Sequence, residues 1–303
     1  MKRYFMLLLA SLLLIGCSPQ EAELTQETPA PPSAQTVELP TATKTPTASP
    51  TPSPTPMFSE PDEKGDIVIN EGLLEPLTPT TYEVSSDTVI LIYHTHAEEA
   101  YRQEGDYTYE ETEENSYRTL DNEKNVVAVG EALKSTLEEL GYTVIHDTTD
   151  VEPPELLSAY SRSLIVMESY PEADIFIDLH RNAANVRMKS DDVVMLNGKR
   201  CAKMFFVVGT GIGTYEGEYD VAPDWESNYR LALSLTERLR EIDSELALDI
   251  RTKVGRYNQH VSNMCILLEL GHNANTLDDV LNSVPLFAEA FADIIILEDG
   301  DGD

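Results

Sequence analysis

Ile175-Phe176-Ile177-Asp178-Leu179-His180-Arg181 is a short apolar run that carries an acid and ends in a histidine followed by an arginine. A second apolar run, Val89 to Tyr93, comes just before two histidines, and a third, Met264 to Leu270, contains Glu269. Short apolar runs of this kind are typical of buried strands. Rigid strands hold the side chains at their ends more firmly than loops do, and a buried carboxylate needs a partner such as a metal ion. The three runs therefore predict a sheet with a metal-binding edge.

Helical patterns separate these strands. Apolar residues recur at spacings of three and four between Asn125 and Leu140, and Gly141 follows as a glycine that ends a helix. We expect helices at residues 125–140, 153–170, 225–242 and 277–297. We expect strands at residues 89–93, 142–146, 173–179 and 264–270. Residues 193–195 with 204–208 are expected to form a hairpin or an ordered excursion around Asn197-Gly198. This alternation predicts an α/β fold, with a largely parallel central sheet and helices on both faces.

The amino terminus resembles a bacterial export signal. Met1-Lys2-Arg3 is basic, and the apolar stretch from Tyr4 to Ile15 is too short for a comfortable membrane span. Leu14-Ile15-Gly16-Cys17 resembles a lipobox, which implies that residues 1–16 are a lipoprotein signal peptide and that Cys17 is lipidated. An ordinary signal peptide or an uncleaved anchor is the alternative. In each case the folded part lies outside the cytoplasm, and lipidation would anchor it to the outer face of the cell membrane.

Composition divides the rest of the chain. Residues 17–81 are rich in Pro, Thr and Ser, and with so little apolar surface we expect a disordered linker. The folded domain is expected at residues 82–297, and residues 298–303 form an acidic tail. The net charge of -33, from 21 basic and 54 acidic residues, argues against nucleic-acid partners. Cys201 and Cys265 are expected to be free buried thiols, although an exported protein could also join them in a disulfide.

Three residues on separate elements are candidate metal ligands. A catalytic zinc site takes three ligands from His, Glu, Asp or Cys, and the chain has no H-E-x-x-H motif to supply two of them from one helix. His96, Glu123 and His180 each lie at the end of a strand or just before a helix. His94 is two residues from His96, so in an extended segment both point to the same face and either could reach the metal. A lone histidine is more often structural, so spacing alone does not decide the ligands.

Several segments of the domain resemble the stage II sporulation protein P family in the same order. They include Ile90-Leu91-Ile92-Tyr93-His94-Thr95-His96-Ala97, Asn125-Val126-Val127-Ala128-Val129-Gly130, Ile177-Asp178-Leu179-His180-Arg181-Asn182-Ala183, Tyr257-Asn258-Gln259 and Leu267-Leu268-Glu269-Leu270-Gly271. That family resembles the zinc N-acetylmuramoyl-L-alanine amidases, whose E-K-x-V-x segment is similar to Glu123-Lys124-Asn125-Val126-Val127. The resemblance departs in two places: His94-Thr95 stands where many amidases have Pro-Gly, and Asn182 replaces an acid.

The resemblance implies a zinc amidase (phosphorylase/hydrolase-like) architecture for residues 82–297 and Zn²⁺ as the cofactor. It implies His96, Glu123 and His180 as zinc ligands and Glu269 as the catalytic acid/base. Arg181 is then expected to stabilise the oxyanion or bind stem-peptide carboxylates, with an ion pair on the sheet rim as the alternative. His94 and His272 are expected beside the ligands or the substrate.

The implied function is cleavage of the N-acetylmuramoyl-L-alanine bond of peptidoglycan, with peptide cross-links as a further candidate substrate, during septal wall remodelling and engulfment in sporulation. A companion wall hydrolase at the septum is the expected partner. Two alternatives stay open: a zinc peptidase acting on cross-links, and a non-catalytic wall-binding scaffold lipoprotein. The tyrosines of the acidic insertion, residues 98–121, either stack on sugars or belong to an exposed disordered excursion.

Overall fold

The computed structural model describes residues 59, 62, 64–69, 77–114, 116–183, 192–212 and 219–298. All of them belong to one unit of the chain, Pro54–Asp303. The predicted signal peptide, Cys17, most of the linker and residues 299–303 lie outside the described residues. Among the described helices, none has the length and apolar character that crossing a membrane requires.

A six-stranded sheet forms the centre of the domain, in the order β3-β2-β4-β9-β7-β8. Its strands are β2 (Val89–Tyr93), β3 (Thr143–His146), β4 (Ile175–Asn182), β7 (Met204–Gly209), β8 (Arg251–Lys253) and β9 (Cys265–His272). Neighbouring strands are parallel except for β7 and β9, which are antiparallel. The predicted largely parallel sheet is therefore confirmed, and its four predicted strands occur within three residues of the expected ends.

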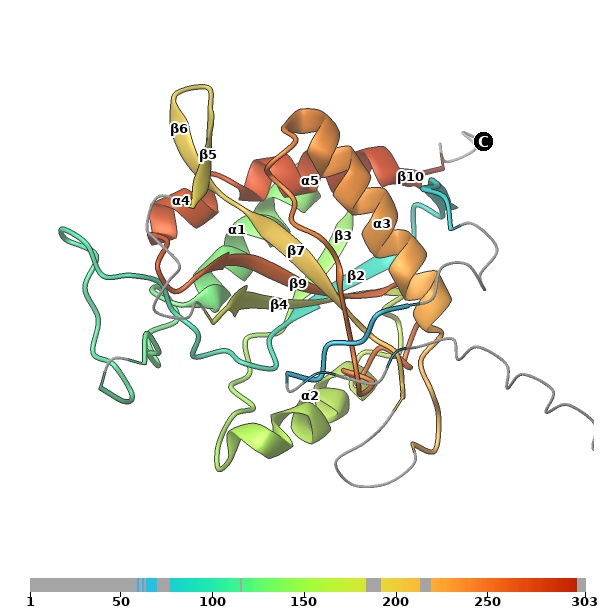
Figure 1. Ribbon diagram of the computed structural model, residues 1–303, viewed down its shortest axis with the longest axis horizontal. Coiled ribbons are helices and arrows are strands. Elements are labelled where there is room, and N and C mark those ends of the chain that lie inside the picture. Colours follow the sequence, from blue (N-terminus) through green and yellow to red (C-terminus); the bar gives the residue numbers. More distant parts are fainter. Residues whose placement is uncertain are drawn as a thin grey trace, which may run out of the picture. The chain divides into compact units, whose positions relative to one another are not determined.

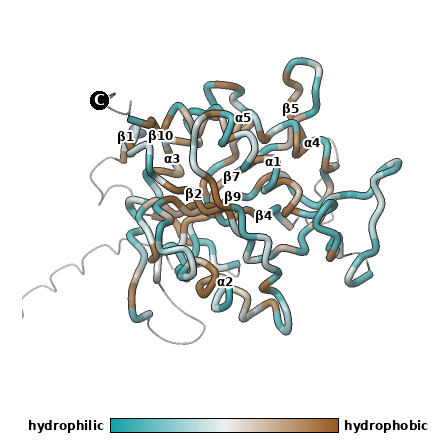
Figure 2. Tube along the Cα trace, turned by 180° about the vertical axis from the view of Figure 1, so that it is seen from behind, coloured by the Kyte–Doolittle hydropathy of each residue, from teal (hydrophilic) through white to brown (hydrophobic). Residues whose placement is uncertain are grey.

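Helices cover both faces of this sheet, as predicted. The helices α1 (Val126–Glu139), α3 (Trp225–Ile242) and α5 (Val284–Ile294) lie on one face and α2 (Ala159–Glu168) lies on the other (Figure 1). Alternate strand residues serve the two faces: Ile90 and Ile92 join the large core under α1, α3 and α5, whereas Leu91 and Tyr93 pack with α2. Figure 2 shows the hydrophobic segments gathered along the central strands, which is the pattern of a sheet buried on both sides.

Local signals explain the ends of the helices that were predicted best. The Asn125 side chain accepts a hydrogen bond from the Val127 N–H and so caps α1, and Gly141 takes the left-handed conformation, with φ of 96°, just after it. Asp224 caps α3 in the same way, by accepting from the Ser227 N–H. Both helices occur as predicted, α1 within one residue at each end and α3 with the same bounds.

Two other helix predictions were too long. The segment after Pro153-Pro154 forms a 3-10 turn, Leu156–Ser158, before α2 begins, and α2 ends at Glu168. The predicted closing helix is three elements: α4 (Leu277–Leu281), α5 and the short strand β10 (Ile295–Leu297). A proline in the first turn of α5 has no N–H to continue the preceding helix, which explains the break. β10 pairs in parallel with β1 (Tyr82–Val84), a two-stranded sheet that the sequence did not indicate.

The hairpin was predicted around the right turn but with the wrong partner strand. β5 (Val193–Leu196) pairs with β6 (Lys199–Ala202), and Met204–Gly209 instead enters the central sheet as β7. Asn197 and Gly198 both have positive φ, 51° and 76°, which is the two-residue turn that joins adjacent strands directly. Such a tight turn leaves no room for a partner that begins six residues later.

Part of the expected linker is ordered. Residues 64–69 run beside the outer strand β8, where the Ile67 N–H donates to Thr252 O (2.9 Å) and the Val254 N–H donates to Gly65 O (3.0 Å). Ile67 is buried, and Lys253 Nζ lies 2.7 Å from Asp66 Oδ1. The prediction of disorder up to residue 81 was therefore wrong for this segment, because Ile67 is buried where the segment bonds to β8 at the edge of the sheet. Cys201 and Cys265 are free and buried, as favoured.

Candidate metal centre

His96 and His180 meet at the carboxyl edge of the sheet. His180 lies on β4, and His96 lies in the turn that follows the neighbouring parallel strand β2. Their ring centroids are 5.3 Å apart, with the rings edge to face at 83°. Carboxyl ends of adjacent parallel strands lie side by side, which explains why residues 84 positions apart come together. The two histidines that the sequence selected therefore share one site.

Buried carboxylates surround His180. Its Nε2 lies 2.8 Å from Asp178 Oδ1, and its Nδ1 lies 3.6 Å from Glu99 Oε2. Burial works to lower the pKa of His180, but the charges of Asp178 and Glu99 outweigh it and hold that pKa well above the usual value. Asp178 in turn accepts hydrogen bonds from the Thr95 N–H (2.9 Å) and the Thr95 hydroxyl (2.7 Å). The imidazole thus has a fixed orientation, with one nitrogen toward Asp178 and the other toward Glu99.

His96 is partly buried and electrically different. Burial, assisted by the neighbouring His180, lowers the pKa of His96 to about 4. Its Nδ1 lies 3.9 Å from a carboxylate oxygen of the buried Glu152 and has no hydrogen-bond partner among the described residues. A neutral imidazole is the form that binds a metal ion. His96 is therefore in the protonation state of a ligand at neutral pH.

The carboxylate beside the two rings is that of Glu99. It is buried, accepts a hydrogen bond from the Arg181 N–H (3.0 Å) and lies close to the Arg181 guanidinium. Burial works to raise the pKa of Glu99, but Arg181 and His180 lower it by more. The net pKa lies below the usual value, and Glu99 is ionised. The predicted ligand Glu123 is exposed, and its N–H donates to Asp121 in the turn before α1. Among the described residues Glu123 belongs to no cluster of possible metal ligands, and it is exposed whereas Asn125 begins the buried face of that turn.

Glu269 lies on β9 directly beside His180 in the sheet register. Its Oε2 is buried and has no hydrogen-bond partner within the described part of the chain. Burial, with a smaller contribution from Glu99, raises the pKa of Glu269 to about 7. A carboxyl group that titrates near neutral pH can both accept and return a proton, which is the property of a general acid/base.

Arg181 is neither a free cation nor an ion pair on an exposed rim. It is buried, and its Nε donates to Ala100 O (2.7 Å) while Nη2 donates to Tyr117 O (3.0 Å). These bonds hold both ends of the insertion that was expected to be disordered. Tyr101 is fully buried, and the Tyr109 hydroxyl donates to its carbonyl oxygen (2.6 Å). The described residues of the insertion are thus packed, and most of its tyrosines serve that packing.

The remaining histidines have partners of their own. His94 Nδ1 lies 2.9 Å from Leu179 O and its Nε2 lies 2.9 Å from His146 Nε2, against the face of α1. His94 therefore does not share the position of His96, because the chain turns directly after Tyr93 and the strand period of two is lost. His272 is buried at the end of β9, where its Nδ1 accepts from the Ala274 N–H (3.1 Å).

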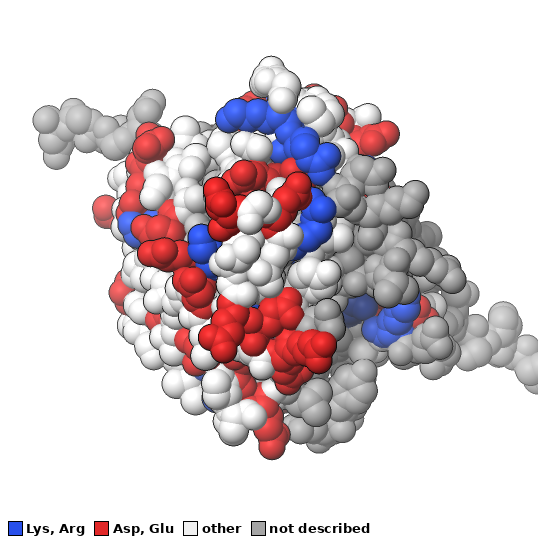
Figure 3. Space-filling view, turned by 90° about the vertical axis from the view of Figure 1, so that its left-hand side faces the viewer, with Lys and Arg blue, Asp and Glu red and all other residues white. Residues whose placement is uncertain are grey.

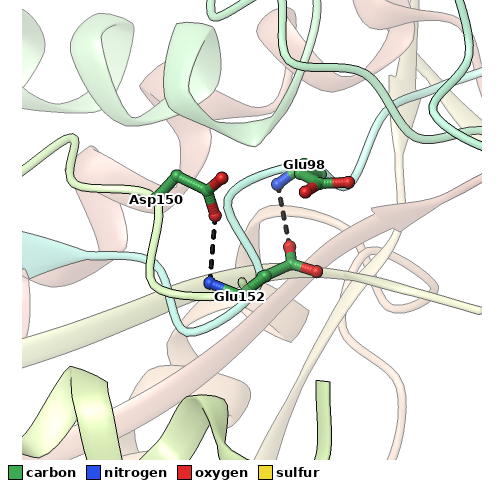
Figure 4. A group of neighbouring side chains, drawn as sticks. All are labelled: Glu98, Asp150 and Glu152. Carbon is green, nitrogen blue, oxygen red and sulfur yellow. Dashed lines mark hydrogen bonds between the residues drawn. The ribbon is translucent and has the colours of Figure 1, made fainter. Parts of the chain in front are cut away.

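An acidic trio adjoins His96. One carboxylate oxygen from each of Glu98, Asp150 and Glu152 lies within 4.8 Å of the others (Figure 4). The Glu98 N–H donates to Glu152 (2.9 Å), and the Arg118 guanidinium contacts both glutamates. The end of the domain that carries the insertion gathers acidic side chains over much of its surface, with fewer basic ones (Figure 3). Because Arg118 already bridges Glu98 and Glu152, we assign the trio to holding the insertion, with Glu152 alone facing His96.

The donor set around His96 and His180 fits zinc in chemical type. Two imidazoles and one carboxylate are a common catalytic zinc set, and each histidine faces a second carboxylate, Glu152 or Asp178, as zinc-bound histidines usually do. Buried His96 Nδ1 and Glu269 Oε2 lack hydrogen-bond partners among the described residues. The trio of His96, His180 and Glu99 does not converge within 4.8 Å, so a metal ion requires these side chains to close together.

Sequence reasoning missed Glu99, Asp178 and Tyr160. Asp178 was within reach, because it precedes His180 by two residues in a strand and so shares its face. Glu99 follows His96 by three residues in a turn, where no periodicity indicates direction. Tyr160 lies on α2, with its ring 5.9 Å from that of His96, a contact across the fold that no local pattern reveals.

Comparisons with known proteins show the family to which the chain belongs. The family model of stage II sporulation protein P matches residues 20–292. Stage II sporulation protein P of Bacillus subtilis (strain 168) is 26% identical over 231 residues, which cover 71% of this chain and 53% of that protein. The chain thus corresponds to about half the length of that relative.

Two solved structures are similar at low levels. The catalytic domain of CwlV, an N-acetylmuramoyl-L-alanine amidase from Bacillus(Paenibacillus) polymyxa var. colistinus, is 16% identical with a TM-score of 0.37, over 68% of this chain and 94% of that one. The catalytic domain of the CD27L endolysin targeting Clostridia Difficile is 13% identical with a TM-score of 0.38, over 69% of this chain and 99% of that one. The family model, which matches most of the chain, decides the relationship: the chain belongs to the stage II sporulation protein P family.

Proposed function

We propose that the chain is a zinc-dependent peptidoglycan hydrolase that cleaves the amide bond between N-acetylmuramic acid and L-alanine. The observation that carries the proposal is the contrast at the carboxyl edge of the sheet. There His96 is neutral, His180 is held in one orientation and Glu99 is ionised. In the same site, burial raises the pKa of Glu269 to about 7. Titratable groups with pKa values driven apart in one site are typical of hydrolytic chemistry.

His96, His180 and Glu99 would hold the zinc ion, and His180, whose pKa is held well above its usual value, would release its ring proton on binding it. When bound, zinc supplies a water molecule of lowered pKa and polarises the carbonyl group of the substrate. Asp178 keeps the His180 ring in one orientation, and the Arg181 N–H keeps the Glu99 carboxylate in place. Glu269 takes the proton of the attacking water and returns it to the departing amine, so that the amide bond breaks with one water consumed.

Metal analysis combined with digestion of purified muropeptides tests this proposal on the full-length chain. Wild-type protein is expected to bind one zinc ion and to release stem peptides with a free L-alanine amine. His180→Ala is expected to lose the metal, whereas Glu269→Gln keeps it and loses turnover. Products cut within the peptide cross-links would favour the zinc-peptidase alternative, and zinc-free wild-type protein without products would favour the wall-binding scaffold.

The family and the amino terminus support a proposal for the place of action. We propose that Cys17 carries a lipid anchor at the outer face of the cell membrane, from which the enzyme remodels the septal wall during sporulation and engulfment with a companion wall hydrolase. Cys17→Ser is expected to release the protein from the membrane fraction. A variant that stays there after Cys17→Ser would require a different anchor.

A further inference from the structure

Tyr160 is an aromatic residue of the site that the proposed function leaves without a role. It lies in the first turn of α2, and its ring stands edge-on to His96, with centroids 5.9 Å apart at 85°. On its other side, Tyr257 stands edge-on at 5.3 Å and 88°. The side chain is only partly buried, so part of Tyr160 is accessible beside His96.

The position of Tyr160 is fixed by a network beneath it. Asn258 Nδ2 donates to Tyr160 O (2.7 Å) and to Ser163 Oγ (3.0 Å). The Ser163 hydroxyl lies 2.9 Å from the Thr95 hydroxyl, which bonds Asp178, the partner of His180. α2 and the candidate metal centre are therefore joined by one buried chain of hydrogen bonds.

The turn that supplies Asn258 is held in an unfavourable backbone conformation. Tyr257 and Asn258 both have positive φ, 48° and 56°, a region that non-glycine residues rarely occupy. Gln259 holds this turn on β7 by donating to Val207 O and accepting from the Gly209 N–H, both at 2.8 Å. Strain that the surroundings maintain in this way is characteristic of functional sites.

The phenol group of Tyr160 faces acidic neighbours. Burial, and then the charges of Asp178, Tyr257, Glu269 and Glu99, hold its pKa well above the usual value. A phenol has an ordinary pKa of about 10, so this hydroxyl is protonated at neutral pH and is available as a hydrogen-bond donor. Arg181, the residue that sequence predicted for stabilising an oxyanion, has its guanidinium bonded to Ala100 O and Tyr117 O.

We propose that the Tyr160 hydroxyl donates a hydrogen bond to the carbonyl oxygen of the scissile amide, and a stronger one to the oxyanion that forms there. The inference rests on the proposed function and deepens it by naming the oxyanion donor. No proton is transferred, because the phenol only shares its hydrogen with the oxygen. A single donor of this kind typically contributes about 100-fold or more to kcat.

Tyr160→Phe tests the inference, because it keeps the ring contacts with His96 and Tyr257 and removes only the hydroxyl. We expect kcat on muropeptides to fall about 100-fold with KM within about twofold, while zinc content and Tm stay at wild-type values. The affinity for a phosphinate analogue of the scissile amide, measured by calorimetry, should fall by a similar factor. Tyr170→Phe is the matched control: it removes a hydroxyl just past the far end of α2, where it donates to Asp147 (2.7 Å), and should change neither kcat nor phosphinate affinity.

Each outcome decides. An active wild type with Tyr160→Phe at the same kcat would overturn the inference and leave the proposed function standing. Loss of zinc or of thermal stability in Tyr160→Phe would assign the hydroxyl to the fold and overturn the inference as well. A wild-type protein that binds zinc but releases no product from any muropeptide would overturn the proposed function, and the role of Tyr160 with it.

Discussion

His180 and Glu269 are register partners on the adjacent parallel strands β4 and β9, so their side chains stand next to each other on one face of the sheet. The pKa values of both groups are raised: that of His180 is held well above its ordinary value, and burial raises that of Glu269 to about 7. The causes differ. The carboxylates of Asp178 and Glu99 face His180, whereas Glu269 Oε2 is buried without a hydrogen-bond partner among the described residues.

The raised pKa of Glu269 predicts a pH dependence of stability in the chelator-treated protein. Between the ordinary value of 4.5 and about 7 the folded state binds a proton at Glu269 that the unfolded state has released. Stability contributed by this group is therefore complete below pH 4.5 and declines as the pH rises through 7. Glu269→Gln cannot ionise, so relative to wild type it should gain up to about 3 kcal/mol in unfolding free energy between pH 4.5 and pH 8.

Urea unfolding of both proteins at several pH values measures this difference. Glu139→Gln, an exposed change at the end of α1, is the control and should follow the wild-type curve. If the curves of wild type and Glu269→Gln run parallel over the whole range, Glu269 does not titrate near neutral pH.

The choice between Glu99 and Glu123 as the third metal ligand can be decided by zinc affinity. Glu99 is buried next to His180, whereas Glu123 is exposed in the turn before α1. Glu99→Gln should therefore weaken zinc binding at least about 10-fold, and Glu123→Gln should leave it unchanged. Competition with a chromophoric chelator gives both constants.

Glu98→Gln controls for the loss of one negative charge in the same turn, because the Glu98 carboxylate lies near Arg118 (3.7 Å) rather than near the histidines. Unchanged affinity in Glu99→Gln together with a loss in Glu123→Gln would restore the ligand that the resemblance implied. Equal losses of zinc affinity in all three variants would show that the effect comes from net charge alone.

Arg181 is expected to hold the insertion in place. Arg181→Met removes the donors to Ala100 O and Tyr117 O and leaves the Glu99 charge buried without its guanidinium, which should cost about 3 to 5 kcal/mol of unfolding free energy. Lys134→Met, which removes a surface ion pair with Glu138, should cost less than about 1 kcal/mol.

Limited proteolysis adds a local measurement for the same pair of variants. Cleavage within residues 101–118 should become faster in Arg181→Met and stay slow in Lys134→Met. A double variant Glu99→Gln with Arg181→Met should lose less than the sum of the single changes, because the two groups compensate each other. Additive losses would show that Arg181 acts through its carbonyl bonds alone.

Periodicity explains which parts of the fold could be predicted. The strands β2, β4 and β9 are continuous apolar runs. The helices α1 and α3 have periodic apolar residues and an N-cap side chain, so the positions of all five elements followed from local sequence. The meeting of His96 and His180 followed too, since both come at the ends of neighbouring parallel strands. The strands β1, β8 and β10 are three residues long, which is too short for any pattern to show.

The third carboxylate and the insertion could not be read from local sequence. Glu99 reaches His180 because the Val126 N–H and the Arg181 N–H fix its backbone and side chain, and both partners are remote in the chain. Glu123 was chosen on its likeness to a ligand segment, and the likeness does not report exposure. Likewise, the acidic insertion is held by Arg181, which is remote in the chain, and by the contact of Arg118 with Glu152.

The contact of α1 with the histidine pair gives a last prediction. A Cβ atom on Gly130 would clash with His146 Nε2 and come within 2.8 Å of His94 Nε2. Both rings are confined, since His94 is buried and bonded to Leu179 O and His146 contacts Glu131. Although alanine normally favours a helix, Gly130→Ala should therefore destabilise the protein by about 1 to 3 kcal/mol. Thermal and urea unfolding measure the change, with Glu139→Ala on the exposed face of α1 as the control, expected within about 0.5 kcal/mol of wild type. The steric cause is checked by adding His146→Ala, which opens the space that the new methyl group needs. The combined loss should then be smaller than the sum of the two single losses, whereas an additive result would place the cost of Gly130→Ala in the helix backbone and not in the histidine contact.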